Sequence, residues 1–352
     1  MFETRPRILA VGTSNPPDRY VQSEIPDLFT VDVPAIRALF GSSHILTRHL
    51  YLPPPNADGL PEETQGELLA KHLRGALEIA PIAVERCLAD TGLTVQDIDY
   101  LACITTTGFM APGLTAHLMK HMGFREDCSR VDIVGMGCNA GLNALNPVAA
   151  WAAANPGRNA LMVCVEICSA AYVFDQTLRT AIVNSLFGDG CAVALVRSAV
   201  SDERAFAPRV LGFNSQIIPP AIGAMRFDWD DQANKFSFFL DRDIPYVVGQ
   251  YAERPVKRLL AEHGLKRRDI RHWLVHSGGK KVIDAIKYNV GITEHDVRHT
   301  SSVLRDFGNL SSASFLFSYQ RLLDEGVVRR GDYGVMMTMG PGSTIETALL
   351  RW

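Results

Sequence analysis

Several sequence signatures of common enzyme classes are missing from this chain of 352 residues. It contains no CxxC pair, no GxSxG elbow, no Walker loop and no GxGxxG fingerprint behind a strand-like run. His117 and His121 have the spacing of two ligands on one helix face, but no acidic residue completes a HExxH zinc motif. These absences argue against a zinc centre, an α/β-hydrolase, a P-loop enzyme and a dinucleotide-binding enzyme.

A charge excess and a long apolar run are also missing. The net charge is -3 with 21% charged residues, which provides no field for binding nucleic acid or an anionic membrane surface. No segment approaches the length of a membrane span, and the apolar run at 8–11 is too short for a secretion signal. The cysteines number seven, an odd count. Together these features predict a cytoplasmic protein with reduced thiols and with no nucleic-acid or membrane partner.

What the chain does have is an alternation of strand-like and helix-like runs. A strand is predicted at Tyr100–Thr105, a helix at Leu114–Met122, a strand at 131–134 and a helix at 139–154. The last of these is rich in alanine and apolar on all sides, which indicates a buried helix. With 47% hydrophobic residues the chain can also bury a large core. The pattern favours α/β layers.

The two halves of the sequence repeat the same order of features. The segment GLTVQDI at 92–98 leads into one apolar strand, and GLKRRDI at 264–270 leads into another at an offset of 172 residues. Further along, Cys138 lies opposite Asn309 at an offset of 171 residues, each directly after a glycine. Chance similarity is the alternative, but the agreement in order and spacing favours a duplication. We therefore predict a first half at 1–207, which carries the cysteine, and a second half at 208–352.

Three residues stand where these repeats could expose reactive side chains. Cys138 lies between Gly137 and the predicted buried helix, where backbone amides and the helix dipole would stabilise a thiolate. His276 ends an apolar strand before a glycine-rich loop, a common position for a general base. Asn309 occupies the mirrored place in the second half. Taken singly, each residue also has a purely structural interpretation. Cys138 could be a core cysteine, His276 a histidine at a strand end and Asn309 a turn or cap residue.

Five motifs follow one another along nearly the whole chain: GMGCNAG at 135–141, LFGDG at 186–190, VHSGG at 275–279, FGNLSS at 307–312 and GPG at 340–342. Together with the order Cys, His, Asn, they resemble the type III polyketide synthases, the chalcone synthase superfamily. Longer stretches, such as FSFFLD at 236–241 and HWLVHSGGKK at 272–281, resemble the bacterial branch of that family that makes 3,5-dihydroxyphenylacetyl-CoA.

The resemblance implies a fold and a reaction. The fold is the thiolase fold, a five-layered αβαβα arrangement of two duplicated halves, in a homodimer with no metal or organic cofactor. The reaction is the decarboxylation and condensation of malonyl-CoA units, four in this branch, with release of CoA. The tetraketide would then be cyclised to 3,5-dihydroxyphenylacetyl-CoA, with crotonase-type proteins as accessory partners.

The resemblance also implies roles for individual residues. Cys138, His276 and Asn309 would be catalytic, and a Cys138 thiolate paired with the His276 imidazolium would be charged well below the pKa of a free thiol. Phe187 and Phe238 would be gatekeepers between a CoA tunnel and a cavity, although without the family both would be core aromatics. The remaining substrate-binding residues implied are Gly278, Gly340, Pro341 and Gly342.

Two segments depart from the plant members of the family. Those enzymes bind the CoA phosphates with basic residues before the segment that corresponds to 45–52, where this chain offers Arg37, Arg48 and few others. They also insert a methionine into the partner's cavity, and this chain has Ala111 at that place with Met110 beside it. The departures affect the CoA contacts and one wall of the cavity.

Three functional hypotheses follow. The first is a type III polyketide synthase, with tetrahydroxynaphthalene synthase as the rival within the family. The second is an enzyme like 3-oxoacyl-acyl-carrier-protein synthase III, which shares Cys, His and Asn but uses a carrier protein. The third is an inactive thiolase-fold protein that only binds CoA esters or a partner. The pair Phe187 and Phe238 and the GPG loop favour the first, and the intact Cys138, His276 and Asn309 count against the third.

Overall fold

The computed structural model describes residues 5–54, 61–198 and 207–352. Within these residues, nine strands form one mixed sheet whose middle is the pair of β1 and β8. In sheet order the strands are β11 (Ile270–Val275), β12 (Tyr333–Gly340), β13 (Thr344–Arg351), β8 (Arg209–Ile217), β1 (Pro6–Ser14), β7 (Gly190–Ser198), β6 (Asn159–Glu166), β4 (Tyr100–Thr105) and β5 (Ser129–Val134).

The sheet has the same topology on both sides of its middle. On one side β1 pairs antiparallel with β7, β7 antiparallel with β6, and β6 parallel with β4. On the other side β8 pairs antiparallel with β13, β13 antiparallel with β12, and β12 parallel with β11. Only β5 has no counterpart among the described strands. The two halves are thus repeats of one fold. The predicted boundary at 207 remains a prediction, because it directly follows residues 199–206, which are outside the described part of the chain.

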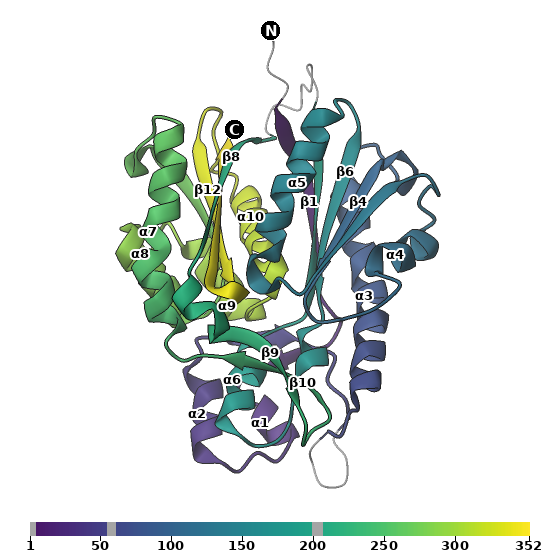
Figure 1. Ribbon diagram of the computed structural model, residues 1–352, viewed down its shortest axis with the longest axis vertical. Helices are drawn as coiled ribbons and strands as arrows, with labels where there is room; N and C mark the ends of the chain where they lie inside the picture. Colours follow the sequence, from purple (N-terminus) through teal and green to yellow (C-terminus); the bar gives the residue numbers. More distant parts are fainter. Residues whose placement is uncertain (1–4, 55–60, 199–206) are drawn as a thin grey trace.

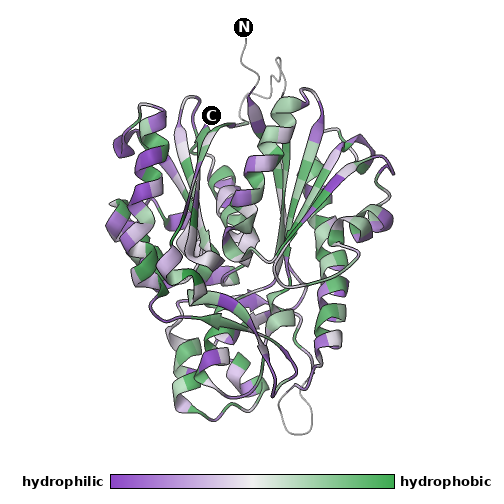
Figure 2. Ribbon diagram, in the orientation of Figure 1, coloured by the Kyte–Doolittle hydropathy of each residue, from purple (hydrophilic) through white to green (hydrophobic). Residues whose placement is uncertain are grey.

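Helices lie between the two halves of the sheet and on both outer faces, as Figure 1 shows. The central layer is α5 (Ala140–Ala154) and α10 (Ser314–Glu325). The outer layers are α3 (Gln65–Leu88) with α4 (Leu114–Met122), and α7 (Ile244–Glu262) with α8 (Lys280–Val290). Figure 2 shows hydrophobic residues along the strands and hydrophilic residues on the outer helices. This is the five-layered αβαβα fold that the family resemblance implies.

Helix α5 is buried less completely than its composition suggests. Its residues that face the sheet halves, among them Leu142, Leu145 and Val148, are buried. Asn146 and Pro147 are exposed, so one side of the helix faces outward. An apolar composition alone therefore did not distinguish a fully enclosed helix from one that lies at the edge of the central layer.

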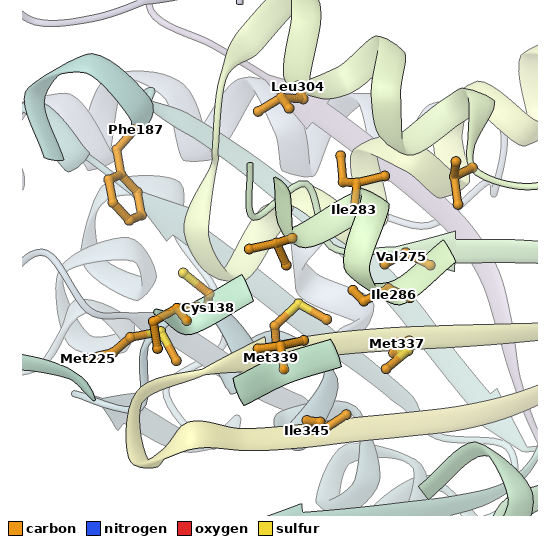
Figure 3. Packing of buried hydrophobic residues seen from close by; sticks show 14 of the residues in the cluster. Cys138, Phe187, Met225, Val275, Ile283, Ile286, Leu304, Met337, Met339 and Ile345 are labelled. Carbon is orange, nitrogen blue, oxygen red and sulfur yellow. The ribbon is translucent and has the colours of Figure 1, made fainter. Parts of the chain in front are cut away.

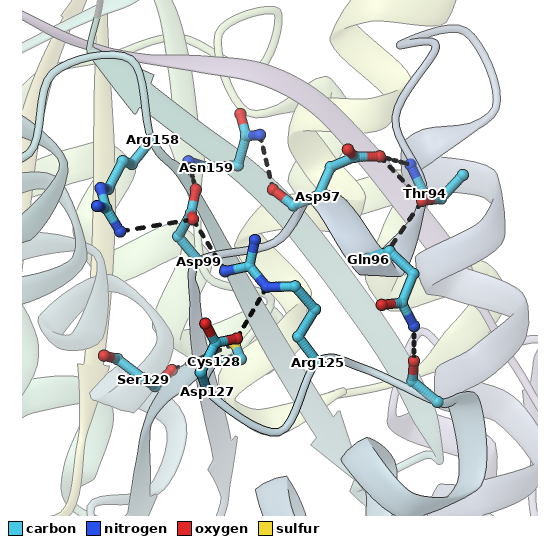
Figure 4. A network of polar contacts seen from close by, with 11 residues as sticks. Thr94, Gln96, Asp97, Asp99, Arg125, Asp127, Cys128, Ser129, Arg158 and Asn159 are labelled. Atoms are coloured by element: carbon cyan, nitrogen blue, oxygen red, sulfur yellow. Dashed lines mark hydrogen bonds and ion pairs between the residues drawn. The ribbon is translucent and has the colours of Figure 1, made fainter.

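The repeated segments at 92–98 and 264–270 form the same local structure. In the first, the backbone N–H of Thr94 donates to the Asp97 carboxylate at 2.8 Å, and in the second Lys266 donates to Asp269 at 2.7 Å. Each aspartate thereby caps a single turn that leads into β4 or β11. Figure 4 shows this turn beside a network in which the Asp99 side chain accepts a hydrogen bond from Arg125 at 3.1 Å.

A smaller subdomain lies at one end of the layers, at the bottom of Figure 1. It contains the hairpin of β9 (Met225–Asp230) and β10 (Lys235–Leu240) and three helices, α1 (Ile25–Leu28), α2 (Pro34–Ser42) and α6 (Leu178–Leu186). A second two-stranded antiparallel sheet pairs β2 (Arg19–Val21) with β3 (Thr47–His49), with α1 and α2 between them in the chain. Helix α9 (Arg298–Phe307) packs against α10 and β3. In the described part of the chain, no helix is both long and apolar enough to span a bilayer.

Candidate active site

Cys138 lies in the turn between β5 and α5. Gly135 and Gly137 have φ angles of 81° and 77°, in the left-handed region that glycine adopts without strain. A Cβ atom at Gly137 would lie 2.3 Å from the Cδ of Pro341, so the turn also needs glycine for space. The backbone then forms a single turn of 3₁₀-helix that continues into α5. Cys138 therefore stands at the N-terminal end of a helix, as predicted.

His276 directly follows β11 and is 1% exposed. Its backbone N–H donates to the Met337 carbonyl at 2.8 Å, which fixes the main chain, and its Nδ1 contacts the hydroxyl of Ser314. That hydroxyl also donates to the Ser311 carbonyl at 3.0 Å. A hydroxyl has one proton to donate, so Nδ1 of His276 carries the proton that joins it to Ser314. Nε2 of His276 is then left to accept a proton.

Asn309 follows Gly308, whose φ of 74° marks a sharp turn at the end of α9. Its backbone N–H donates to the Leu186 carbonyl and its carbonyl accepts from the Gly188 N–H, both at 2.9 Å. The side-chain Oδ1 accepts a hydrogen bond from the backbone N–H of Ser311 at 2.8 Å. This contact fixes the amide orientation, so that the Nδ2 group of Asn309 is the donor that hydrogen-bonds the Cys138 sulfur.

These three residues line one cavity of about 340 Å³. Gly278, Phe187 and Phe238 line the same cavity, so six of the predicted site residues come together; its other residues include Arg242, Lys280 and Lys281. Cys138, Phe187 and Phe238 also line a second, smaller cavity of about 30 Å³, together with Thr106, Thr107, Cys168 and Ser311.

The two phenylalanine rings border both cavities. Their centroids are 5.8 Å apart and their planes lie at 89°, an edge-to-face contact. Figure 3 shows Cys138 with Phe187 and Met225 to one side and Met339 to the other. The position of the rings between two cavities that share Cys138 agrees with the gatekeeper role that the family implies, and that role remains a prediction.

The loop of Gly340, Pro341 and Gly342 does not line the cavities that contain Cys138. It packs behind the Cys138 turn: a Cβ atom at Gly340 would lie 2.3 Å from Oδ1 of Asn139. None of the three residues lines either of the two cavities that Cys138 lines. Their contact with substrate therefore stays a prediction, whereas their packing against the turn is a feature of the fold.

Burial sets the charge states of the site. It raises the pKa of the Cys138 thiol, and hydrogen bonding from Ser311 and Asn309 opposes this rise. It lowers the pKa of His276. Each charge taken alone is thus disfavoured, because burial removes its hydration. Transfer of the thiol proton to the imidazole creates both charges together, so that each compensates the other. The expected thiolate–imidazolium pair therefore depends on both residues at once.

A buried carboxylate beside Cys138 was missed at the sequence level. Glu166 ends β6 and is fully buried, with one carboxylate oxygen accepting from the backbone N–H of Thr106 at 2.9 Å and the other from the Ser312 hydroxyl at 2.6 Å. Thr107 and Ser311 also donate to it, both at 3.1 Å. Burial raises the pKa of Glu166 and these hydrogen bonds oppose that rise. A single glutamate at a strand end gives no signal in a sequence.

The two arginines considered for the CoA phosphates do not line the larger cavity. Arg37 pairs with Asp27 at the protein surface. Arg48 is 0% exposed, so it cannot reach a phosphate group outside the protein. The basic side chains that do line the cavity are Arg242 and Lys281, both exposed, and Lys280, which also binds Asp284 at 2.5 Å.

Comparison with known proteins gives matches along the whole chain. The chalcone and stilbene synthase models match residues 3–200 with the N-terminal domain and 214–352 with the C-terminal domain. A 3,5-dihydroxyphenylacetyl-CoA synthase of Streptomyces toyocaensis is 56% identical, over 99% of this chain and 90% of the relative.

More distant relatives belong to the same family. A 1,3,6,8-tetrahydroxynaphthalene synthase of Streptomyces peucetius subsp. caesius is 34% identical over 98% of this chain and 93% of the relative. The crystal structure of PKS-I from the brown alga Ectocarpus siliculosus superposes with a TM-score of 0.91 at 25% identity, covering 99% of this chain and 98% of that one. With both domain models matched and a relative this similar over nearly its full length, the chain belongs to the chalcone and stilbene synthase family of type III polyketide synthases.

Proposed function

We propose that this enzyme condenses four malonyl-CoA units and cyclises the tetraketide to 3,5-dihydroxyphenylacetyl-CoA. The observation that carries the proposal is the convergence of Cys138, His276 and Asn309 on one cavity that reaches exposed cations. The identity of 56% to a 3,5-dihydroxyphenylacetyl-CoA synthase, against 34% to a tetrahydroxynaphthalene synthase, supports this product over the naphthalene.

Loading comes first. His276 accepts the proton of the Cys138 thiol at Nε2, and the thiolate attacks the thioester carbonyl of malonyl-CoA. The bond from the carbonyl to the CoA sulfur breaks, the CoA thiolate leaves and takes its proton from solvent, and His276 keeps the proton at Nε2. The acyl group then remains on Cys138 as a thioester. The exposed Arg242 and Lys281 at the cavity are the residues proposed to hold the CoA phosphates.

Extension requires a carbon nucleophile. A second malonyl-CoA loses CO₂, and the electrons of the broken bond form an enolate whose negative charge lies on the thioester oxygen. The Nδ2 group of Asn309 donates to that oxygen, and so does Nε2 of His276, which kept its proton after loading. The enolate carbon attacks the acyl group on Cys138, the bond to sulfur breaks, and the chain is longer by two carbons.

Cyclisation follows from a malonyl starter. Loss of its terminal carboxylate makes the far end of the chain a carbanion, which attacks the ketone nearest the thioester. Aldol closure and loss of water give a six-membered ring with two hydroxyl groups, and the CoA ester survives. The inner cavity of about 30 Å³ has room for only one or two waters, so the bent chain must also occupy the larger cavity. Such a small inner space supports a short product and disfavours a bulky aromatic starter.

The test is carbon accounting with uniformly labelled malonyl-CoA as the only substrate. We expect a dihydroxyphenylacetyl product, or its CoA ester, with eight labelled carbons, because each unit leaves two carbons in the chain. Mass spectrometry of the quenched reaction measures this directly. A requirement for a second acyl-CoA, or for an acyl carrier protein, would contradict the proposal. A labelled ten-carbon naphthalene would assign the rival activity within the family.

Conservative changes of the two phenylalanines test the gatekeeper role. In Phe187→Leu and Phe238→Leu we expect an altered product spectrum or chain length, because the rings border both cavities. The loss of stability should be smaller than the roughly 3–5 kcal/mol of a full Phe→Ala truncation, because leucine keeps most of the apolar volume. The matched control is Phe315→Leu, a fully buried residue that lines neither cavity. A large fall in Tm with unchanged products would make both rings ordinary core residues.

The proposal also covers the oligomeric state of the enzyme, its compartment and its protein partners. A homodimer in the cytoplasm, assisted by crotonase-type proteins, is the arrangement that the resemblance implies. The seven cysteines are all free in the structure, which agrees with a reducing compartment. Analytical ultracentrifugation of the purified enzyme tests the dimer, and product yield with and without the accessory proteins tests their contribution.

A further inference from the structure

Arg48 is a buried cation that the proposed mechanism does not use. It lies in β3, is 0% exposed, and lines neither of the cavities that Cys138 shares. We propose that Arg48 is a positioning residue that holds the gatekeeper Phe187 and, through the adjoining backbone, the Asn309 amide in their working places. This proposal rests on the proposed function.

The guanidinium of Arg48 binds the end of α6. Its Nη1 donates to the carbonyl of Asn184 at 2.7 Å and to the carbonyl of Phe187 at 2.6 Å. The last carbonyls of a helix have no partners inside the helix, and the negative end of the helix dipole lies there. Arg48 thus supplies both a donor and a positive charge to the place where Phe187 leaves the helix.

Two side chains support this contact from the other side. Nε of Arg48 donates to Oε1 of Gln22 at 2.7 Å, and Nη1 lies 2.7 Å from the hydroxyl of Tyr172. That hydroxyl donates in turn to the Phe187 carbonyl at 2.5 Å. The carbonyl of Phe187 therefore accepts one hydrogen bond from Arg48 and one from Tyr172, and these two donors also contact each other. Gln22 in turn donates to the Ser185 carbonyl at 2.7 Å.

The same side chain supports the backbone that carries Asn309. A Cβ atom at Gly308 would lie 2.8 Å from Cδ of Arg48 and 2.8 Å from the Leu186 carbonyl, so this backbone runs directly against both. Asn309 then exchanges hydrogen bonds with Leu186 and Gly188, the two neighbours of Phe187. A shift of the Phe187 carbonyl is consequently passed on to Asn309.

Burial of this charge is costly, which indicates that it has a purpose beyond filling space. Burial lowers the pKa of Arg48, and no ion pair within the described residues includes it. An apolar side chain of similar volume would avoid that cost. Lysine cannot replace the contacts, because its single ammonium lacks the planar fork that reaches carbonyls and a side-chain amide together. Geometry is therefore what arginine contributes here.

The experiment compares Arg48→Lys and Tyr172→Phe with the wild type. The active sites are counted by alkylation of Cys138, and CO₂ release and product are measured per counted site. We expect Arg48→Lys to lower kcat about 10–100-fold, with the KM for malonyl-CoA within about twofold, because Arg48 does not line the cavity. Tyr172→Phe should give a smaller loss of the same kind. In both, truncated products should increase, because Phe187 is displaced.

The matched control is Val84→Ala in α3, a buried residue in a different hydrophobic cluster from that of Phe187 and Tyr172, where the truncation lowers stability. It should keep the wild-type rate per counted site. Equal rates per site in Arg48→Lys and the wild type would overturn the positioning role, and so would an equal loss in Val84→Ala. If the wild type itself released no CO₂ from malonyl-CoA, the proposed function would fail together with the inference. If the wild type is active and Arg48→Lys has the same rate per site, only the positioning role of Arg48 fails.

Discussion

Replacement of Cys138 by alanine is expected to abolish polyketide formation and to leave a slow decarboxylation of malonyl-CoA. The growing chain is proposed to be held by the Cys138 sulfur. Without this sulfur, no acyl group is bound at the site for the enolate to attack. The proposed donors to the enolate oxygen are Nδ2 of Asn309 and, when it carries a proton, Nε2 of His276, and both side chains remain in the variant. Their hydrogen bonds to Ser311 and Ser314 do not involve Cys138.

The measurement is CO₂ release beside mass spectrometry of all products from malonyl-CoA. Cys87→Ala is the matched control, because Cys87 is a buried cysteine of α3 that lines neither cavity. The control should keep both activities. Condensation at the wild-type rate in Cys138→Ala would remove this residue from the mechanism, and loss of both activities with an intact fold would make it part of the decarboxylation site.

Asn309→Ala should suppress decarboxylation far more than it suppresses loading of Cys138. Loss of one fixed donor to a developing oxyanion costs about 2.7–4 kcal/mol, or roughly 10²–10³ in rate. Loading needs a base for the thiol, and an amide has no basic nitrogen to accept that proton. We therefore expect covalent loading within about tenfold of the wild type, since the same amide also stabilises the thiolate.

Intact-mass measurement of the acyl-enzyme, taken at short times beside CO₂ release, separates the two steps. The control is Asn143→Ala, which removes a partly buried amide from α5 whose 3.0 Å hydrogen bond to Glu346 lies outside the site. That variant should change neither step by more than a few fold. Equal losses of loading and decarboxylation in Asn309→Ala would show that the two steps share this residue.

Much of the architecture could be predicted because local patterns determine it. The strand at Tyr100–Thr105 and the helix at Leu114–Met122 are found with the predicted bounds. The repeat at an offset of 172 residues reappears as two capped turns at Asp97 and Asp269. Apolar periodicity, glycine turns and caps are all written within a few neighbouring residues, so they can be recognised without the rest of the chain.

The parts that could not be predicted depend on distant contacts. Arg48 was considered only for the CoA phosphates, and nothing near it in the sequence indicates burial; its partners Tyr172 and Phe187 are more than a hundred residues away. Glu166 was missed for the same reason, since its donor Ser312 comes from the other half. Charged residues are buried only where distant groups satisfy them, and this satisfaction cannot be seen in a local pattern.

The repeated halves contribute unequally to the chemistry. Cys138 belongs to the turn before α5, in the first half, whereas His276 and Asn309 follow β11 and α9 in the second. Under the proposed roles, a chain whose halves have not yet docked holds a thiol without its base, and enolate donors without an acyl group for the enolate to attack. Such a chain cannot join malonyl units, because no acyl group is held where the enolate forms. Because the site is divided between two repeats, carbon–carbon bond formation requires that both halves have folded and docked, so a folding intermediate makes no polyketide.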